Sequence, residues 1–256
     1  MVDYDVMGNI AIIRNEKKTL KQKKADAKII LSRPSVETVL DRVTNVKGRL
    51  RTIKVRHIAG VKNLISLYRE NACSFKFNIE TCYFSPRLSN ERQKISEKIK
   101  MKDKVLVMFA GIGVYPIVLY KYSKPEHIVG IEIGRECIKY FKENLKLNRI
   151  PEGKISVVSG DVKKKVDRSL GKFDVVIMAR PNLRETFLKY GLIACKKGGR
   201  LFYYGFCKDT EVDLMVNDLV KEGKELGYRL KVIEKKFAGE IAPYKHRFRI
   251  EFKVRG

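Results

Sequence analysis

A glycine-rich turn and an acidic residue further along the chain are the first features of this sequence that could bind a ligand. The apolar run over residues 105–109 carries no charge, which is typical of a buried parallel strand. It ends at Ala110-Gly111-Ile112-Gly113, where small residues let the backbone turn closely against a ligand. A second apolar strand, residues 127–131, is followed by Glu132, whose carboxylate can accept hydrogen bonds from ribose hydroxyls. This order of elements predicts a nucleoside pocket at the carboxyl ends of the strands.

The residues after the glycine turn indicate which nucleoside the pocket takes. Dinucleotide-binding proteins place a third glycine where this chain has Pro116. A pyrophosphate needs the free N–H groups of a helix N-terminus, and Pro116 removes one of them while Val114 and Tyr115 add bulk. The pocket therefore suits a nucleoside without a pyrophosphate, such as S-adenosylmethionine. The alternative is a strand–helix–strand unit with an ordinary turn and no ligand.

A carboxylate that could act as a general base lies upstream of the glycine turn. Ser85-Pro86-Arg87 is typical of a turn that enters a helix, and Glu91 and Arg92 are neighbours one turn from the start of that helix. Adjacent charges on a helix also mark an ordinary solvated face. The residue types alone therefore leave both interpretations open.

The charge of the chain points to a polyanionic partner. Its 256 residues include 55 Lys and Arg against 29 Asp and Glu, a formal net charge of +26. Lys and Arg bind nucleic acid by neutralising phosphates and releasing counterions, so we expect an RNA-binding protein. The alternative is that lysine merely fills the surface of the protein.

Cysteine, histidine and hydropathy patterns exclude several other classes. The five cysteines are scattered and odd in number, which favours reduced thiols in a cytoplasm and argues against a zinc or iron–sulfur site. The three histidines lie far apart, so a histidine-based catalytic site is not expected. No run of 18 apolar residues predicts a membrane span, and the first residues lack a signal-peptide core.

The second part of the chain, residues 101–256, alternates between strand and helix patterns. Strands are expected at 105–109, 127–131, 155–158, 173–178 and 200–204, and helices at 114–122, 134–147, 183–195 and 211–227. Residues 228–237 and 246–254 alternate in polarity and could pair as an antiparallel edge. Five strand–helix units with a terminal pair predict a doubly wound α/β sheet.

The first hundred residues differ from the rest and predict a small basic α+β domain that contacts RNA. Residues 14–56 hold 14 Lys or Arg and four acids. Residues 9–14 and 49–58 are expected to form strands, the second with basic residues facing outward, and residues 17–24 to begin a basic helix.

Several blocks of sequence resemble one family of RNA-modifying enzymes. YFSPRLSNER at 83–92, the MFAGIG loop, VGIE, GDV and GGRLFYYGF occur in that order, with RENACSFKFN upstream and AGEIAPYKHRFRIEF near the end. Together they resemble the archaeal and eukaryotic tRNA guanosine-37 N1-methyltransferases and the related wybutosine-pathway enzymes. The resemblance implies a class I methyltransferase-like, Rossmann-like fold, S-adenosylmethionine as donor and tRNA as partner. Longer members carry a further domain that grips the tRNA elbow; this chain begins too late to contain it, so an anticodon stem-loop should suffice as substrate and a monomer as enzyme.

The resemblance also assigns roles to individual residues. It implies that Glu91 is the general base on guanine N1, that Arg51 is the catalytic arginine, and that Tyr83 lies near the target base. The implied donor-binding residues are Arg92, Phe109, Ala110, Gly111, Gly113, Glu132, Ile133, Asp161, Val162, Ala179 and Pro181. The implied substrate-binding residues are Tyr83, Ser85, Arg87 and Asn182.

These roles suit the chemistry of guanine. N1 carries a proton at neutral pH, so a carboxylate must remove that proton as the methyl bond forms. Negative charge then builds on O6, which a guanidinium stabilises. Where the family often has Met-Asn-Leu-Pro, this chain has Met178-Ala179-Arg180-Pro181. Ala179 leaves room for the tricyclic wyosine precursor as an alternative substrate, for methyl or aminocarboxypropyl transfer, with Asn182 as a possible substitute for the missing amide. A non-catalytic RNA-binding protein is the more distant alternative.

Overall fold

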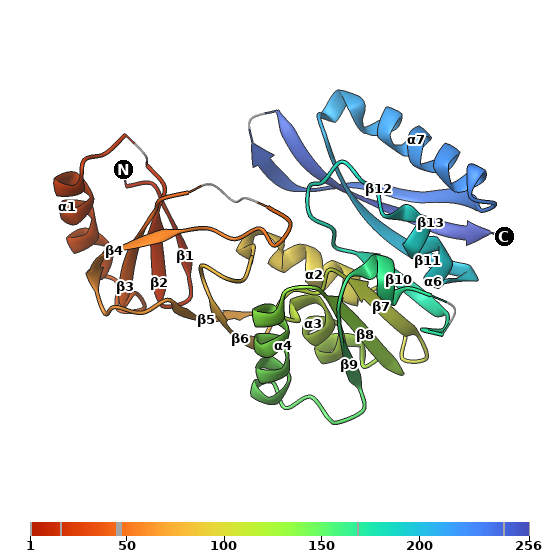
Figure 1. Cartoon of the computed structure of the whole chain (residues 1–256), viewed down its shortest axis with the longest axis horizontal. Coiled ribbons are helices and arrows are strands. Elements are labelled where there is room, and N and C mark those ends of the chain that lie inside the picture. The colour runs from red at the N-terminus through yellow and green to blue at the C-terminus, as the bar shows by residue number, and fades with distance from the viewer. Residues whose placement is uncertain (1, 16, 45–47, 168, 243, 256) are drawn as a thin grey trace.

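The computed structural model describes residues 2–15, 17–44, 48–167, 169–242 and 244–255. Its largest element is a seven-stranded sheet with the order β12-β13-β11-β10-β7-β8-β9 (Figure 1). The bounds of these strands are β7 Lys104–Met108, β8 His127–Glu132, β9 Ile155–Ser159, β10 Phe173–Met178, β11 Cys195–Cys207, β12 Arg229–Ala242 and β13 Lys245–Arg255. Strands β7 to β11 pair in parallel, whereas β13 is antiparallel to β11 and β12.

Helices cover both faces of this sheet. Alternate residues of a strand point to opposite faces, so an apolar strand such as β7 contributes side chains to a core on each side. Val105 and Val107 of β7 belong to the core that packs on α2 (Ser89–Ser96), α3 (Val114–Ser123) and α4 (Arg135–Leu147). Leu106 and Met108 belong to the core on the opposite face. That core packs on α5 (Val162–Lys165), α6 (Leu188–Ala194) and α7 (Val212–Glu225). The prediction of a doubly wound α/β sheet is confirmed.

One expectation for the second half of the chain is confirmed and another is wrong. The two terminal strands pair antiparallel at the edge of the sheet as expected, in the order β12-β13-β11. The expected helix over 183–195 begins only at Leu188. Before it, the Arg180 guanidinium donates to the carbonyl oxygens of Leu183 and Glu185, which holds this segment as a loop.

The N-terminal part forms a separate four-stranded sheet with the order β1-β2-β3-β4 (Figure 1). Its strands are β1 Tyr4–Met7, β2 Ile10–Ile13, β3 Thr38–Arg42 and β4 Val55–Gly60. Helix α1 (Leu20–Leu31) begins at Thr19, which caps it, and contributes Ala27 and Ile30 to a small core shared with β2, β3 and β4. The basic helix expected after residue 17 is thus present.

The strand expected over residues 49–58 is wrong in its first half, since β4 begins only at Val55. Arg51 has a φ of +55°, a left-handed conformation that no strand accepts. Residues 48–51 turn instead, and Arg49, Leu50 and Arg51 reach the cavity described below.

A hairpin joins the two sheets. Strands β5 (Ile65–Glu70) and β6 (Cys73–Asn78) pair with each other, and β5 bonds to the N-terminal part through Met7 and Asn9. Asn144 lies on α4 and Asn148 is the C-cap residue of that helix. Their side-chain amides form hydrogen bonds with the backbone of β6. The sequence predicts that residues 1–100 form the small domain. The hairpin contacts both parts, so we propose that the division lies near residue 64.

Candidate active site

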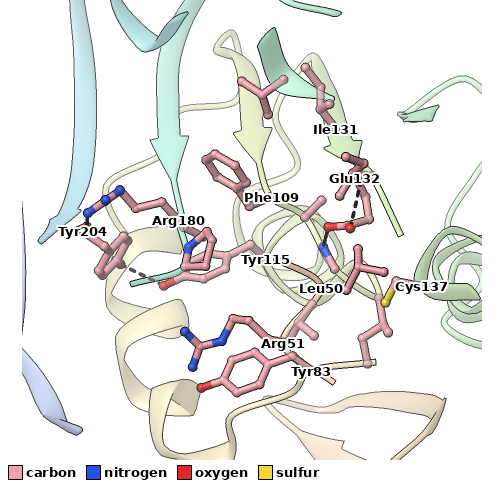
Figure 2. Close-up of a pocket in the computed structure, with 18 of the residues that line it drawn as sticks. Leu50, Arg51, Tyr83, Phe109, Tyr115, Ile131, Glu132, Cys137, Arg180 and Tyr204 are labelled. Carbon is pink, nitrogen blue, oxygen red and sulfur yellow. Dashed lines mark hydrogen bonds between the residues drawn. The ribbon is translucent and has the colours of Figure 1, made fainter. Parts of the chain in front are cut away.

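A cavity of about 150 Å³ lies where the parallel strands end (Figure 2). The residues that follow β7, β8, β9 and β10 all line it: Gly111, Ile133, Asp161 and Ala179 respectively. Because the carboxyl ends of adjacent parallel strands converge at one edge, residues far apart in the sequence meet here. The sequence predicts a nucleoside pocket at this edge of the sheet, and the cavity lies there.

The two glycines of the loop have different tasks. Gly111 lines the cavity, has a φ of +58°, and would accept a Cβ without any neighbour within 4 Å. A Cβ on Gly113 would lie 2.1 Å from the ring of Phe141 on α4. Gly113 is therefore required for packing of the loop on α4, and it does not line the cavity among the described residues.

The carboxylate of Glu132 is fixed by backbone N–H groups. One oxygen accepts from Gly111 at 2.8 Å, and the other accepts from Ile133 at 2.9 Å and from Gly134 at 2.7 Å. Burial raises the pKa of Glu132, and the three backbone hydrogen bonds oppose this rise. The Gly111 N–H that could bind a phosphate is thus already paired with a carboxylate, which disfavours a pyrophosphate and leaves oxygen lone pairs for ribose hydroxyls.

A residue from the N-terminal part closes one side of the cavity. Asp161 caps α5 through the Lys163 N–H, and its other oxygen lies 2.6 Å from the guanidinium of Arg49. Burial raises the pKa of Asp161, but the hydrogen bond and the charge of Arg49 lower it. The second effect outweighs the first, so the pKa of Asp161 lies below its ordinary value. Sequence reasoning missed the role of Arg49. The only feature of the sequence that marks this residue is the basic stretch that follows Gly48.

Two arginines and a tyrosine lie where the cavity opens into a wider groove of about 970 Å³. Arg51, Tyr83 and Arg247 line both spaces, and the Arg51 guanidinium lies 4.1 Å from the centre of the Tyr83 ring (Figure 2). Burial raises the pKa of Tyr83, but the two guanidinium charges outweigh it and lower the pKa. The mouth of the cavity is therefore electropositive beside an aromatic face, which suits a nucleobase.

Glu91 lies deeper than the sequence suggested. Its side chain is buried and accepts hydrogen bonds from the Tyr204 hydroxyl at 2.8 Å and from Arg249 at 3.0 Å. Glu91 is not among the described residues that line the cavity, whereas Tyr204 is. The interpretation of Glu91 as a solvated surface residue is wrong, because the residue is only 6% exposed.

Arg92 is also buried, and its partner comes from the hairpin. The guanidinium donates to both carboxylate oxygens of Glu70 and to the carbonyl oxygen of Ser85. It lines the cavity beside the ring of Tyr115, with its charge already balanced. Sequence reasoning missed Glu70, although it is the second residue of the RENACSFKFN block that carried the resemblance.

The segment after β10 presents a small side chain to the cavity. Ala179, Arg180 and Pro181 line it, and Arg180 also lies over the ring of Tyr203 at 5.3 Å. Asn182 lines the neighbouring groove instead, so it does not replace the family's asparagine inside the cavity. At the position of that asparagine the chain therefore presents only the methyl side chain of Ala179 to the cavity.

All but one of the expected donor-binding residues line the cavity, Gly113 being the exception. They are Arg92, Phe109, Ala110, Gly111, Glu132, Ile133, Asp161, Val162, Ala179 and Pro181. Of the expected substrate residues, Tyr83 and Ser85 line both spaces, and Arg87 and Asn182 line the groove. The cavity residues that sequence reasoning did not assign to the site include Arg49, Tyr115, Tyr204 and Arg247.

Within the described ranges, no three His, Cys, Asp or Glu side chains gather in a geometry that could hold a metal ion. The described helices include none with the length and apolarity needed to cross a membrane.

Comparison with known proteins identifies relatives of both parts of the chain. The TRM5/TYW2 methyltransferase domain matches residues 66–233, and the TYW2 N-terminal domain matches residues 2–63. The tRNA (guanine(37)-N(1))-methyltransferase Trm5b of Pyrococcus abyssi is 29% identical over 98% of this chain and 74% of its own. The tRNA (guanine(37)-N(1))/4-demethylwyosine(37)-methyltransferase Taw22 of Nanoarchaeum equitans is 26% identical over 97% of this chain and 98% of its own. The structure of Methanocaldococcus jannaschii Trm5 in complex with adenosine has a TM-score of 0.84, with 28% identity over 100% of this chain and 75% of that one.

Proposed function

Since the chain belongs to the TRM5/TYW2 methyltransferase family, we propose that it transfers a methyl group from S-adenosylmethionine to N1 of guanosine 37 in tRNA. The observation that carries this proposal is the junction of two spaces. A cavity that ends at Glu132 opens, past Arg51 and Tyr83, into a groove wide enough for a nucleobase on a strand. A donor and an acceptor base can therefore meet at one point.

The residues of the cavity fit the methyl donor. Glu132 offers oxygen lone pairs for ribose hydroxyls, and Phe109, Ile133 and Val162 offer apolar contacts for an adenine ring. The relative solved in complex with adenosine supports a nucleoside as ligand, since adenosine is part of the methyl donor. When bound, the donor supplies an electrophilic methyl group.

The residues at the junction suit the acceptor base. The Nε of Arg51 is buried without a hydrogen-bond partner in the structure, and its guanidinium lies beside Tyr83. There it can stabilise negative charge on guanine O6 while Tyr83 contacts the base. Glu91 is the carboxylate that finally receives the N1 proton.

The groove favours tRNA as the partner. Six arginines line it: Arg14, Arg42, Arg49, Arg51, Arg87 and Arg247. Three acids, Asp3, Asp5 and Glu240, also line the groove. Asp3 and Asp5 pair with Arg14 and Arg87, and Asp161 pairs with Arg49, so only part of the arginine charge is balanced. The remaining positive charge lies beside the electropositive mouth of the cavity and suits the phosphates of an anticodon stem-loop. We further propose that the protein acts as a monomer, and the five buried free cysteines suit a reducing cytoplasm.

The tricyclic wyosine precursor at position 37 is the second candidate substrate. Ala179 leaves space on the β10 side of the cavity, and Taw22, whose name includes 4-demethylwyosine, matches this chain over nearly its whole length. A bifunctional enzyme would use the same donor and the same groove.

Transfer of labelled methyl groups to tRNA transcripts tests the proposal. A transcript with guanosine at position 37 should become labelled, and a transcript with adenosine at that position should not. Equal labelling of both transcripts would contradict the assignment to position 37, and donor binding without any labelling would favour the non-catalytic RNA-binding alternative.

Replacing Glu132 should weaken donor binding specifically. Glu132→Gln keeps the shape of the side chain but removes the charge that holds three N–H groups and the ribose hydroxyls. We expect binding of S-adenosylmethionine to weaken by about 1.5 to 3 kcal/mol, measured by isothermal titration calorimetry. Glu136→Gln, on the exposed first turn of α4, is the matched control and should bind as the parent does. Equal binding by both variants would remove Glu132 from the donor site.

Binding of tRNA should depend steeply on salt through the groove. The Arg42→Gln, Arg87→Gln variant should bind more weakly, and its log–log salt slope should be shallower by up to about 2, because each lost phosphate contact removes roughly one released counterion. Lys139→Gln, Lys142→Gln on the exposed face of α4 removes the same charge elsewhere and should leave the slope unchanged. Equal slopes for the two variants would place the tRNA away from the groove.

A further inference from the structure

The proposed base does not reach the cavity by itself. Glu91 projects from α2 into the space beneath β11 and β13, where Tyr204 and Arg249 bond to the same carboxylate oxygen, Oε1. Arg249 is fully buried, and its other nitrogen pairs with Glu234 on β12. The position of Glu91 is therefore set by an ion pair, and some other group must connect it to a substrate in the cavity.

Tyr204 is the group that lies between them. It lines the cavity, and its hydroxyl accepts from the Tyr115 hydroxyl at 2.8 Å (Figure 2). The same hydroxyl donates to Glu91. A phenol oxygen has two lone pairs, and only one is used by Tyr115. The second can accept a proton donor that enters the cavity.

The charges around Tyr204 keep it neutral and donating. Burial and the carboxylate of Glu91 raise its pKa well above the ordinary value, and burial raises the pKa of Tyr115 to about 12. The other charged groups that act on this site are Arg92 on α2, and Arg247 and Arg249 on β13. Tyr204 thus holds its own proton toward Glu91 at neutral pH and does not act as a standing tyrosinate.

We propose that Tyr204 relays the proton from guanine N1 to Glu91, an inference that rests on the proposed function. As the N1–methyl bond forms and the sulfonium S–methyl bond breaks, the N1 proton passes to the Tyr204 oxygen. The Tyr204 proton passes at the same time to Glu91 Oε1. Tyr204 is unchanged at the end, the donor leaves as a neutral thioether, and Glu91 holds the proton until solvent removes it.

Tyr204→Phe removes only the relaying hydroxyl. Under saturating donor and tRNA, we expect its single-turnover rate to fall by about 100-fold, the scale of losing proton transfer by a positioned group. The dissociation constants of donor and tRNA, measured by calorimetry and filter binding, should stay within about threefold. Tyr203→Phe is the matched control: it is the neighbouring residue on β11, makes the same chemical change, and belongs to the core on the opposite face of the sheet.

The pH profile separates a relay from a structural role. Without the relay, the N1 proton must leave to solvent, so the rate of Tyr204→Phe should rise steadily with pH and recover part of the loss. A variant that is merely distorted would stay slow at every pH. Thermal unfolding of both phenylalanine variants shows whether the fold is intact.

A double-mutant cycle with Glu91→Gln completes the test. If the two residues act in series, the double variant should be about as slow as the slower single variant; if Glu91 acts directly, the two losses should multiply. Multiplying losses, or a Tyr204→Phe rate within threefold of the parent, would overturn the relay even if Glu91→Gln is slow and the proposed function holds. Absence of methylation by the parent protein would instead overturn the proposed function.

Discussion

Glu91→Gln is expected to lower the single-turnover rate of methyl transfer by at least about 100-fold, with the affinities for donor and tRNA nearly unchanged. Glutamine keeps the shape of the side chain and can still accept from Tyr204 and Arg249, but it cannot take up a proton. Since proton removal matters only as the methyl bond forms, the loss should fall on the rate and not on binding. Rapid-quench assays with saturating labelled donor measure this rate, and calorimetry measures binding.

The control for this prediction lies at the end of the same helix. Glu97 is the C-cap residue of α2 and is exposed. Changing it to Gln should leave the rate within about twofold, because exposed charges contribute little. If Glu91→Gln behaved in the same way, Glu91 would have no role in proton transfer. Asp161 would then be the next carboxylate to test, since it lines the cavity. Asp103 is the other carboxylate to consider, but it precedes the amino end of β7, away from the cavity, and pairs with Arg200.

Arg51→Ala is expected to slow methyl transfer by about 100-fold and also to weaken tRNA binding. Loss of one donor aimed at a developing oxyanion typically costs about 3 kcal/mol in the transition state. Arg51 also lines the groove, so its charge contributes to phosphate binding as well. Single-turnover rates at saturating tRNA separate the first effect from the second, and filter binding measures the second alone.

Arg69→Ala, on the exposed face of β5, removes an equal charge away from both spaces and should change neither the rate nor the affinity. If Arg51→Ala weakened tRNA binding but kept the saturated rate, Arg51 would be a phosphate contact and would not stabilise O6. Arg51→Lys distinguishes charge from geometry, because a lysine keeps the charge but not the planar fork of donors.

The parts of the site that lie within one strand–turn–helix unit were predictable from the sequence. The glycine loop and Glu132 follow from local patterns, because a buried strand, a tight turn and an acid at the end of the next strand determine where their side chains meet. The role of Asp161, at the end of β9, came instead from the family resemblance of the Gly160-Asp161-Val162 block. The partners of Glu132 within the unit, the Gly111 and Gly134 N–H groups, are backbone groups that every such unit supplies.

The parts that depend on long-range packing were not predictable. Glu91 meets Arg249 across 158 residues and Tyr204 across 113, and no local periodicity encodes such partners. The turn at residues 48–51 resembled a strand because its residues alternate in polarity. The left-handed conformation of Arg51 ends that pattern, and Arg49 pairs with Asp161. The segment before Leu188 was likewise expected to be helical. It is a loop instead, because the Arg180 guanidinium donates to carbonyl oxygens of this segment.

Mass spectrometry of nucleosides from tRNA incubated with the protein and S-adenosylmethionine tests the central claim most directly. The tRNA is digested to nucleosides after the reaction, and a transcript with adenosine at position 37 serves as the control. We predict one new product, 1-methylguanosine, that appears with guanosine 37 and is absent from the control. A methyl group on another atom or at another position, or an aminocarboxypropyl product in place of a methylated one, would contradict the claim.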